Sequence, residues 1–190
     1  MSLLELRAIA CIRGGRLLFE GLDLVLGPGS AALATGPNGA GKSSLIRVAA
    51  GLLPATAGTV EREKPAALAD EGLALDPKLT LGRALGFWSR LDGAVAEEAM
   101  AAMAAMGLSA LAPVPVRMLS TGQRKRSALA RVLASGAPLW LLDEPANGLD
   151  PDGLARLEAA IAAHRAGGGA VLAASHQPLA LPGAIPVTLG

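Results

Sequence analysis

The alternation of apolar and polar positions divides the chain into a β-rich beginning, a helical middle and an end in which strands and helices alternate. Short apolar runs bounded by glycine-rich turns predict strands within residues 3–12, 15–36, 138–145, 170–176 and 184–190. The runs at 138–145 and 170–176 stay apolar until polar residues end them, which is typical of parallel strands buried on both faces.

Apolar positions at helical spacing predict helices within residues 42–53, 81–91, 94–108, 122–136 and 152–168. Pro54 and Gly58 provide stop signals after the first of these helices, and residues 59–76 carry no clear pattern. Strands alternate with helices around a stretch, about residues 77–135, that is helical throughout. This order predicts an α/β fold with a helical subdomain, in a single domain of residues 1–190.

The composition excludes several classes of protein. Hydrophobic residues make up 52% of the 190 residues and the net charge is +1, which gives room for a large core and no basic footprint for nucleic acid. Cys11 is the only cysteine, so an internal disulfide and a cysteine-cluster metal site are excluded. The chain lacks the roughly 18 continuous apolar residues of a membrane-spanning helix and the pattern of a secretory signal. Met100, Met103 and Met106 have helical spacing in an alanine-rich stretch, so we expect them to pack in the core rather than bind a metal.

The segment GPNGAGKS, residues 36–43, matches the phosphate-loop pattern G-x-x-x-x-G-K-[ST] between a predicted strand and a predicted helix. Its glycines allow backbone N–H groups to surround phosphates, Lys42 reaches the β- and γ-phosphates, and the Ser43 hydroxyl can bind Mg²⁺. The pattern therefore predicts ATP and Mg²⁺ as ligands. The expected nucleotide-binding residues here are Gly36, Pro37, Asn38, Gly39, Ala40, Gly41, Lys42, Ser43 and Ser44.

Polar side chains end the two strands that are predicted to be buried. Asp143, at the end of LWLLD, is placed to hold Mg²⁺ through water, so Ser43 and Asp143 are the expected metal ligands. Glu144 can act as the general base on an attacking water, and His176 can donate to the γ-phosphate and hold the geometry of that water. We expect Glu144 and His176 to be the catalytic residues.

A second helix start with the features of an anion site lies in MLSTGQRKRSALARVL, residues 118–133. Its Ser/Thr/Gly turn precedes an amphipathic helix, whose first backbone N–H groups have no partner within the helix. The chain thus contains the phosphate loop, LSTGQ, LWLLDEP, ANGLD and a histidine in this order. This set of motifs and its order resemble those of the nucleotide-binding subunits of ATP-binding-cassette transporters, and the resemblance covers almost the whole chain.

This resemblance implies an α/β phosphate-loop core with an antiparallel β subdomain and an inserted helical subdomain. Ser120, Gly122 and Gln123 match the signature loop of the family, and residues 146–150 match the loop after the catalytic glutamate. The resemblance further implies a head-to-tail dimer in which the signature loop of each chain contacts the γ-phosphate of ATP held by the other. The expected partners are a second copy of the chain and integral membrane permease subunits, with no nucleic acid. The expected location is peripheral, on the cytoplasmic face of the inner membrane.

A narrower resemblance is carried by LSTGQRKRSALARVLASGAPLWLLDEPANGLDPDGLARL together with SHQPL. Both segments are similar to the haem-exporter ATP-binding subunits of bacterial cytochrome c maturation. The resemblance implies an ATP-hydrolysing subunit that energises haem delivery or release of a haem chaperone, without binding haem itself. Two alternatives stay open: the ATPase subunit of another exporter with a different substrate, and a regulatory cassette that binds ATP without hydrolysing it.

The sequence departs from the family pattern at three places. No glutamine lies between the phosphate loop and the helical subdomain, so Asp70 or Glu71 is expected to take the place of the Mg²⁺-binding glutamine. The usual adenine-stacking aromatic residue is missing, and Arg13 can stack on the base through its guanidinium plane. Thr121 occupies the position where glycine is commonest in the signature loop.

The permease is expected to dock on the helical subdomain near residues 70–90. Phe87 and Trp88 lie side by side there on different helix faces, and Trp88 is the candidate anchor because tryptophan is enriched at interface hot spots. The alternative is that both aromatic residues belong to the core.

Overall fold

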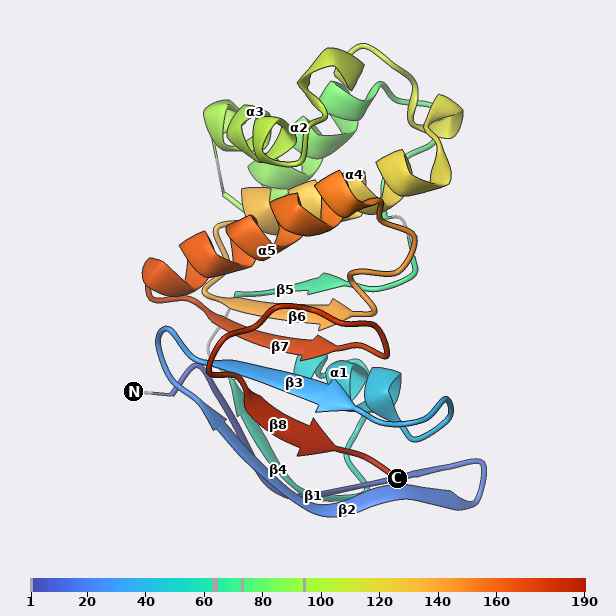
Figure 1. The fold of residues 1–190 in the computed structure, drawn as a ribbon, viewed down its shortest axis with the longest axis vertical. Coiled ribbons are helices and arrows are strands. Elements are labelled where there is room, and N and C mark those ends of the chain that lie inside the picture. Colours follow the sequence, from blue (N-terminus) through green and yellow to red (C-terminus); the bar gives the residue numbers. More distant parts are fainter. Residues whose placement is uncertain (1, 63–64, 73, 94) are drawn as a thin grey trace.

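The computed structural model describes residues 2–62, 65–72, 74–93 and 95–190. Figure 1 shows an antiparallel sheet at one end, a parallel sheet in the middle and a group of helices at the other end. The predicted α/β class is therefore confirmed, and so is the antiparallel sheet that the family resemblance implied.

The parallel sheet has the strand order β5-β6-β7-β3-β8. Its strands are β3 (Ala31–Thr35), β5 (Ala66–Ala69), β6 (Leu139–Asp143), β7 (Ala170–Ala174) and β8 (Ile185–Thr188). Helix α1 (Lys42–Ala50) covers one face, while α4 (Thr121–Ala134) and α5 (Pro151–Ala166) cover the other (Figure 1).

Every residue of β6 and β7 is buried, as the continuous apolar runs predicted. The reason is the two-residue period of a strand between two layers of helices. Trp140 and Leu142 pack into the core under α4 and α5, whereas Leu139 and Leu141 pack into the core around α1. The central strands are thus held in register by both cores.

The antiparallel sheet is formed by β1 (Leu4–Arg13), β2 (Arg16–Leu26) and β4 (Ala57–Arg62) in the order β2-β1-β4. Gly14 and Gly15 connect β1 to β2 with φ values of 55° and 75°, which a two-residue hairpin turn requires and glycine adopts without strain. The buried face of the sheet packs into the same core as α1. Strands β4 and β5 fall largely within residues 59–76, for which the sequence showed no clear pattern.

Helices α2 (Leu81–Leu91) and α3 (Ala96–Ala105) pack on α4 through one hydrophobic core. Two short helices, η1 (Ser109–Leu111) and η2 (Val116–Met118), connect α3 to α4. Met103 and Met106 are buried in that core, as expected, but Met100 is 62% exposed, so its predicted core position is wrong. Residue 94, the first of the expected helix 94–108, lies outside the described residues.

Trp88 is not the exposed aromatic residue of α2. Its indole Nε1 donates to the carbonyl oxygen of Ala74 at 2.6 Å, and the Arg131 guanidinium lies 4.5 Å from the centre of its ring. Trp88 packs against the helical core, whereas Phe87 is 51% exposed. Phe87 is therefore the more exposed aromatic residue of α2, and the anchor role expected of Trp88 stays a prediction.

None of the described helices has the length and apolar character needed to cross a membrane.

Candidate functional site

The predicted phosphate loop lies at the carboxyl end of the parallel sheet, between β3 and the first turn of α1. Two of its glycines are required by close packing. A Cβ atom on Gly36 would collide with the carbonyl oxygen of Leu189, and one on Gly41 would lie 3.1 Å from the Phe19 ring. Gly41 also has a φ of 103° at the N-cap of α1, a value that side chains rarely allow. Because glycine has no side chain at these positions, the loop can adopt this tight conformation, and its backbone N–H groups can lie close to a ligand.

Lys42 is buried, and its ammonium group is held inside the curve of the loop. Its Nζ donates to the carbonyl oxygens of Gly36 and Pro37 at 2.8 and 3.1 Å. This arrangement places a positive charge next to the free N–H groups at the start of α1. Together they form an environment that favours a phosphate group.

Ser43 and Asp143, the two expected metal ligands, are in direct contact. The Ser43 hydroxyl donates to Asp143 Oδ1 at 3.0 Å, although 100 positions separate them in the sequence. Burial raises the pKa of Asp143, and the hydrogen bond from Ser43 opposes this rise. The two side chains offer adjacent oxygen ligands, which suit Mg²⁺. Among the described residues no group of three or more His, Cys, Asp or Glu could hold a metal ion, so a cation here would also need phosphate or water oxygens.

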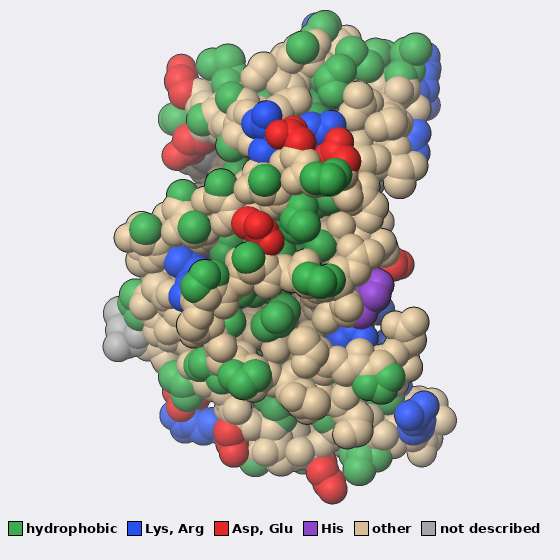
Figure 2. All heavy atoms as spheres, viewed as in Figure 1, with side chains coloured by type: hydrophobic (Ala, Val, Ile, Leu, Met, Phe, Trp, Pro, Cys, Tyr) green, Lys and Arg blue, Asp and Glu red, His purple; other side chains and the backbone are tan. Residues whose placement is uncertain are grey.

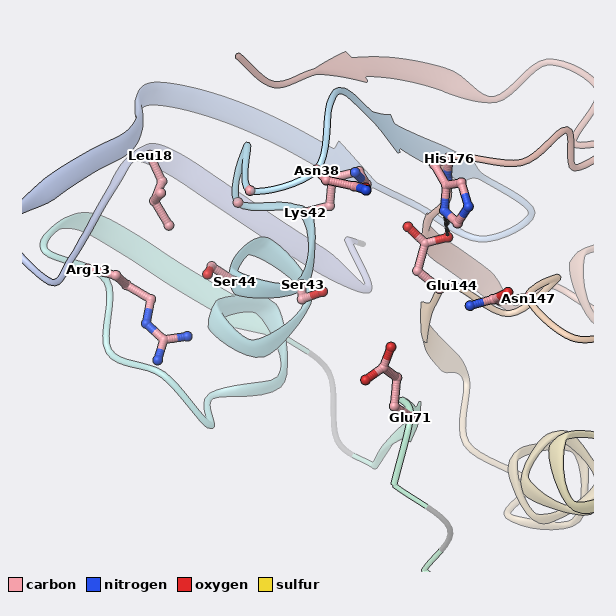
Figure 3. Close-up of a pocket in the computed structure, with 12 residues that line it drawn as sticks. Arg13, Leu18, Asn38, Lys42, Ser43, Ser44, Glu71, Glu144, Asn147 and His176 are labelled. Carbon is pink, nitrogen blue, oxygen red and sulfur yellow. Dashed lines mark hydrogen bonds and ion pairs between the residues drawn. The ribbon is translucent and has the colours of Figure 1, made fainter. Parts of the chain in front are cut away.

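Glu144 and His176, the two expected catalytic residues, are in hydrogen-bond contact at the ends of β6 and β7. The Nδ1 of His176 lies 2.7 Å from Glu144 Oε2, and the backbone N–H of His176 donates to the same oxygen at 3.2 Å (Figure 3). Glu144 has a φ of 46°, which is unfavourable for a residue with a side chain. Its N–H donates to Ala174 O at 2.8 Å and so fixes this turn against β7. Such strain persists where the surroundings determine the geometry, as at many active sites.

Lys42, Ser43, Glu144 and His176 line one open cavity of about 560 Å³, shown in Figure 3. The phosphate loop and the first turn of α1 form its middle, with Arg13 and Leu18 on one side and the Glu144–His176 pair on the other. The lining residues are Arg13, Leu18, Asn38, Gly39, Gly41, Lys42, Ser43, Ser44, Glu71, Glu144, Asn147 and His176.

Not every expected residue lines this cavity. Gly36 and Pro37 contribute through the carbonyls that hold Lys42, Ala40 is buried beneath the loop, and Asp143 reaches the site through Ser43. Leu18, for which the sequence indicated no role, also lines the cavity, as does Asn147 from the loop 146–150 that follows Glu144.

Of the two acids considered as substitutes for the missing glutamine, Glu71 lines the cavity and Asp70 does not. The Asp70 Oδ1 instead accepts the N–H of Gly72 at 2.9 Å, which closes a local turn. In Figure 3 the carboxylate of Glu71 is directed toward Ser43. The structure thus favours Glu71 over Asp70.

Two of the signature residues, Ser120 and Gln123, cap the N-terminus of α4. The Ser120 hydroxyl accepts the N–H of Gln123 at 3.2 Å, and Gln123 Oε1 accepts the N–H of Ser120 at 2.9 Å, which forms a capping box. Ser120, Gly122 and Gln123 are not among the residues that line the phosphate-loop cavity of the same chain. The fold therefore does not bring them to that nucleotide cavity.

Comparison with protein families gives one match over most of the chain. The family model described as ABC transporter matches residues 19–147.

Several relatives match nearly the full length of the chain, and each bears the name cytochrome c biogenesis ATP-binding export protein CcmA. The protein from Sphingopyxis alaskensis is 61% identical over 95% of this chain and 93% of its own length. The protein from Novosphingobium aromaticivorans is 60% identical over 91% of this chain and 88% of its own length.

Solved structures share the fold at low sequence identity. An ABC transporter ATP-binding protein from Pyrococcus furiosus has a TM-score of 0.85 at 21% identity, over 98% of this chain and 96% of that chain. An ATP-binding subunit of an ABC transporter has a TM-score of 0.83 at 22% identity, over 92% and 80% of the two chains.

Proposed function

We propose that this chain, which belongs to the ABC transporter family and within it to the cytochrome c biogenesis ATP-binding export proteins, hydrolyses ATP to drive a membrane export complex. As a member of the family it is an ATP-binding subunit. The observation that carries the proposal is the meeting of three features at one cavity. These are Lys42 in the phosphate loop, the Ser43–Asp143 contact and the Glu144–His176 pair.

Nucleotide binding would change the partners of Lys42. Its ammonium group now bonds two loop carbonyls, and it would exchange them for charged oxygens of the β- and γ-phosphates. Backbone N–H groups of the loop would surround the same phosphates. Arg13 and Leu18, on the other side of the cavity, would contact the base, with the guanidinium plane in place of an aromatic ring.

Ser43 and Asp143 would hold Mg²⁺, the serine directly and the aspartate through water. When bound, the cation neutralises charge on the β- and γ-phosphates. The adjacent oxygens of the two side chains fit this role, because hard divalent cations prefer oxygen ligands. Glu71 is directed toward the same position and would provide a further carboxylate near the cation (Figure 3).

Glu144 would take a proton from the attacking water. The water oxygen forms a bond to the γ-phosphorus while the bond to the bridging oxygen breaks, and that electron pair leaves with ADP. With Nδ1 of His176 bonded to Glu144, its Nε2 would face a γ-phosphate oxygen and could donate to it. The pair thereby fixes the position of the carboxylate before the water arrives.

The proposed export complex serves cytochrome c maturation, by haem delivery or by release of a haem chaperone. The name of the relatives supports a role in cytochrome c biogenesis, and the substrate would be selected by the permease rather than by this chain. The chain would lie at the cytoplasmic face of the inner membrane as a peripheral subunit.

The permease would contact the helical end of the molecule. Large apolar side chains are exposed there, including Phe87, Leu91 and Met100, and hydrophobic side chains reach the surface of this end in Figure 2. Because Phe87 is the more exposed aromatic residue of α2, we propose it as an aromatic contact.

The proposed function is tested by phosphate release from ATP and Mg²⁺, with the purified chain alone and with its detergent-solubilised membrane partner. We expect hydrolysis that the partner stimulates. ATP binding without phosphate release in either sample would contradict the proposal and would favour a regulatory cassette.

The proposed head-to-tail dimer predicts that two inactive variants restore activity when they are mixed. Lys42→Ala damages the loop side of each composite site, and Ser120→Asp damages the signature side. Aspartate is chosen because it caps a helix as well as serine does, so α4 keeps its cap while a carboxylate faces the γ-phosphate. In a mixed dimer one of the two sites contains no substitution.

Random exchange makes half of the dimers mixed, so ATPase activity is expected to recover to ~25% of wild type if the two sites work independently. The measurement is phosphate release after subunit exchange, and exchange is verified with fluorescently labelled chains. Absence of recovery would contradict independent shared sites. A covalently linked dimer with one substituted site would then show whether the signature loop serves its own chain or each site depends on the other.

A further inference from the structure

A second cavity, of about 330 Å³, adjoins the nucleotide cavity. Glu71, Glu144 and Asn147 line both of them. The remaining walls come from the loop after β5 and from the first two turns of α4. The lining residues are Asp70, Glu71, Gly72, Thr121, Arg124, Lys125, Ala128, Glu144 and Asn147.

The acidic groups on this boundary create an electrostatic problem for nucleotide binding. Glu71 is directed toward Ser43, and Glu144 lies on the same side of the phosphate loop (Figure 3). ATP would therefore bind with its highly charged triphosphate close to these carboxylates. Like charges repel, more so at the half-buried Glu144 than at the exposed Glu71, so a further cation beside Lys42 would favour ATP binding.

Two basic residues of α4 line this wall, Arg124 and, in the second turn of the helix, Lys125. Lys125 is partly buried, and burial lowers the pKa of its ammonium group, against the attraction of Asp143, Glu71, Asp70 and Glu144. Within residues 2–62, 65–72, 74–93 and 95–190, the ammonium group forms no hydrogen bond or close ion pair. Of these carboxylates only Glu71 and Glu144 line both cavities, and Glu144 is hydrogen-bonded to His176, so Glu71 is the one left for Lys125 to compensate.

The neighbouring basic residues of α4 are used in other contacts. Arg124 donates to the carbonyl oxygens of Leu119 and Arg117 at 3.1 and 2.7 Å, and Arg126 donates to that of Met106 at 3.2 Å. These arginines secure the start of α4 and its contact with α3. Arg124 is thus held in place by backbone carbonyls, whereas the described residues give the Lys125 ammonium group no such partner.

We propose that Lys125 is a positioning residue of the nucleotide site, whose ammonium group compensates the charge of Glu71 so that this carboxylate does not repel bound ATP. The inference rests on the proposed function, since it requires ATP at the phosphate loop. It links α4 to the nucleotide of the same chain through charge, without contact to the phosphates. Glu71 and Lys125 would then form one functional unit.

The test is a double-mutant cycle on ATP affinity, measured by calorimetry in EDTA so that any role of Glu71 in binding a cation does not enter. Lys125→Gln is expected to weaken ATP binding about tenfold, or about 1.4 kcal/mol. Glu71→Gln is expected to bind at least as tightly as wild type. In the Glu71→Gln background, adding Lys125→Gln is expected to change the affinity by less than about twofold.

Two further variants make the result specific. Lys78→Gln removes one positive charge from an exposed position away from both cavities, and it is expected to leave ATP affinity unchanged. Lys125→Arg keeps the charge and is expected to bind ATP as wild type does. If Lys125→Gln fails to fold, Lys125→Met, which keeps an apolar stem for the buried position, takes its place in the cycle.

An equal loss of affinity in both backgrounds would overturn the inference, because Lys125 would then act on the nucleotide or on the fold directly. Normal affinity in Lys125→Gln, or a tenfold loss in Lys78→Gln, would overturn it as well. Failure of the wild-type chain to bind ATP would contradict the proposed function itself. The two failures are therefore distinguishable.

Discussion

Replacing Lys42 by alanine is expected to abolish measurable ATP binding and hydrolysis. The substitution removes the buried ammonium group that now lies 2.8 and 3.1 Å from the carbonyl oxygens of Gly36 and Pro37. The variant would also lack the two bonds that Lys42 is proposed to form with the β- and γ-phosphates when ATP binds. Hydrogen bonds to charged groups contribute about 1.5–3 kcal/mol each, so the loss of two of them predicts an affinity at least about 100-fold lower.

The measurement is calorimetric titration with ATP, together with phosphate release. Lys78→Ala is the matched control, because Lys78 is exposed and lies outside the nucleotide cavity. Circular dichroism must show that the Lys42→Ala chain is folded. Hydrolysis at the wild-type rate in the folded variant would refute the assignment of the phosphate loop.

Replacing Glu144 by glutamine is expected to preserve ATP binding and to reduce turnover roughly 10²–10⁴-fold, the usual effect of losing a general base. An amide has the shape of a carboxylate and can still bond to the His176 ring, now at 2.7 Å. It cannot accept a proton from water at neutral pH. The prediction therefore separates binding from chemistry within one substitution.

The measurements are single-turnover hydrolysis and ATP affinity, with Glu97→Gln on the exposed face of α3 as the charge-matched control. We expect wild-type values from the control. A Glu144→Gln chain with a near-normal rate would assign the base to another residue, and His176 would be the first to test. Loss of ATP binding in this variant would contradict the proposed role in a different way, because the carboxylate would then act in binding.

Much of the fold could be predicted from sequence because its signals are local. The phosphate-loop glycines satisfy backbone conformations and close contacts that other residues cannot adopt, and Gly36 and Gly41 show this directly. The continuous apolar runs of β6 and β7 follow from burial on both faces, which any parallel strand between two helical layers requires. Such patterns identify an element wherever it lies in the fold. The roles of the individual site residues stay predictions.

The tertiary structure decided which side chains meet. The Ser43–Asp143 hydrogen bond spans 100 positions, and the Glu144–His176 pair depends on adjacent β6 and β7. Pairing of this kind is a property of strand order, and the sequence pattern of a single strand does not contain it.

The tertiary structure also decided the use of neighbouring residues that look equivalent in sequence. Glu71 lines the nucleotide cavity while Asp70 caps a turn, and Phe87 is exposed while Trp88 packs beside Arg131. Adjacent residues point in different directions from the backbone, so the packing of surrounding elements determines which of them is buried. The sequence by itself thus determined the family, the α/β class and the candidate residues. Only the packing of distant segments determined which of those residues share a cavity, since burial and charge depend on neighbours in space.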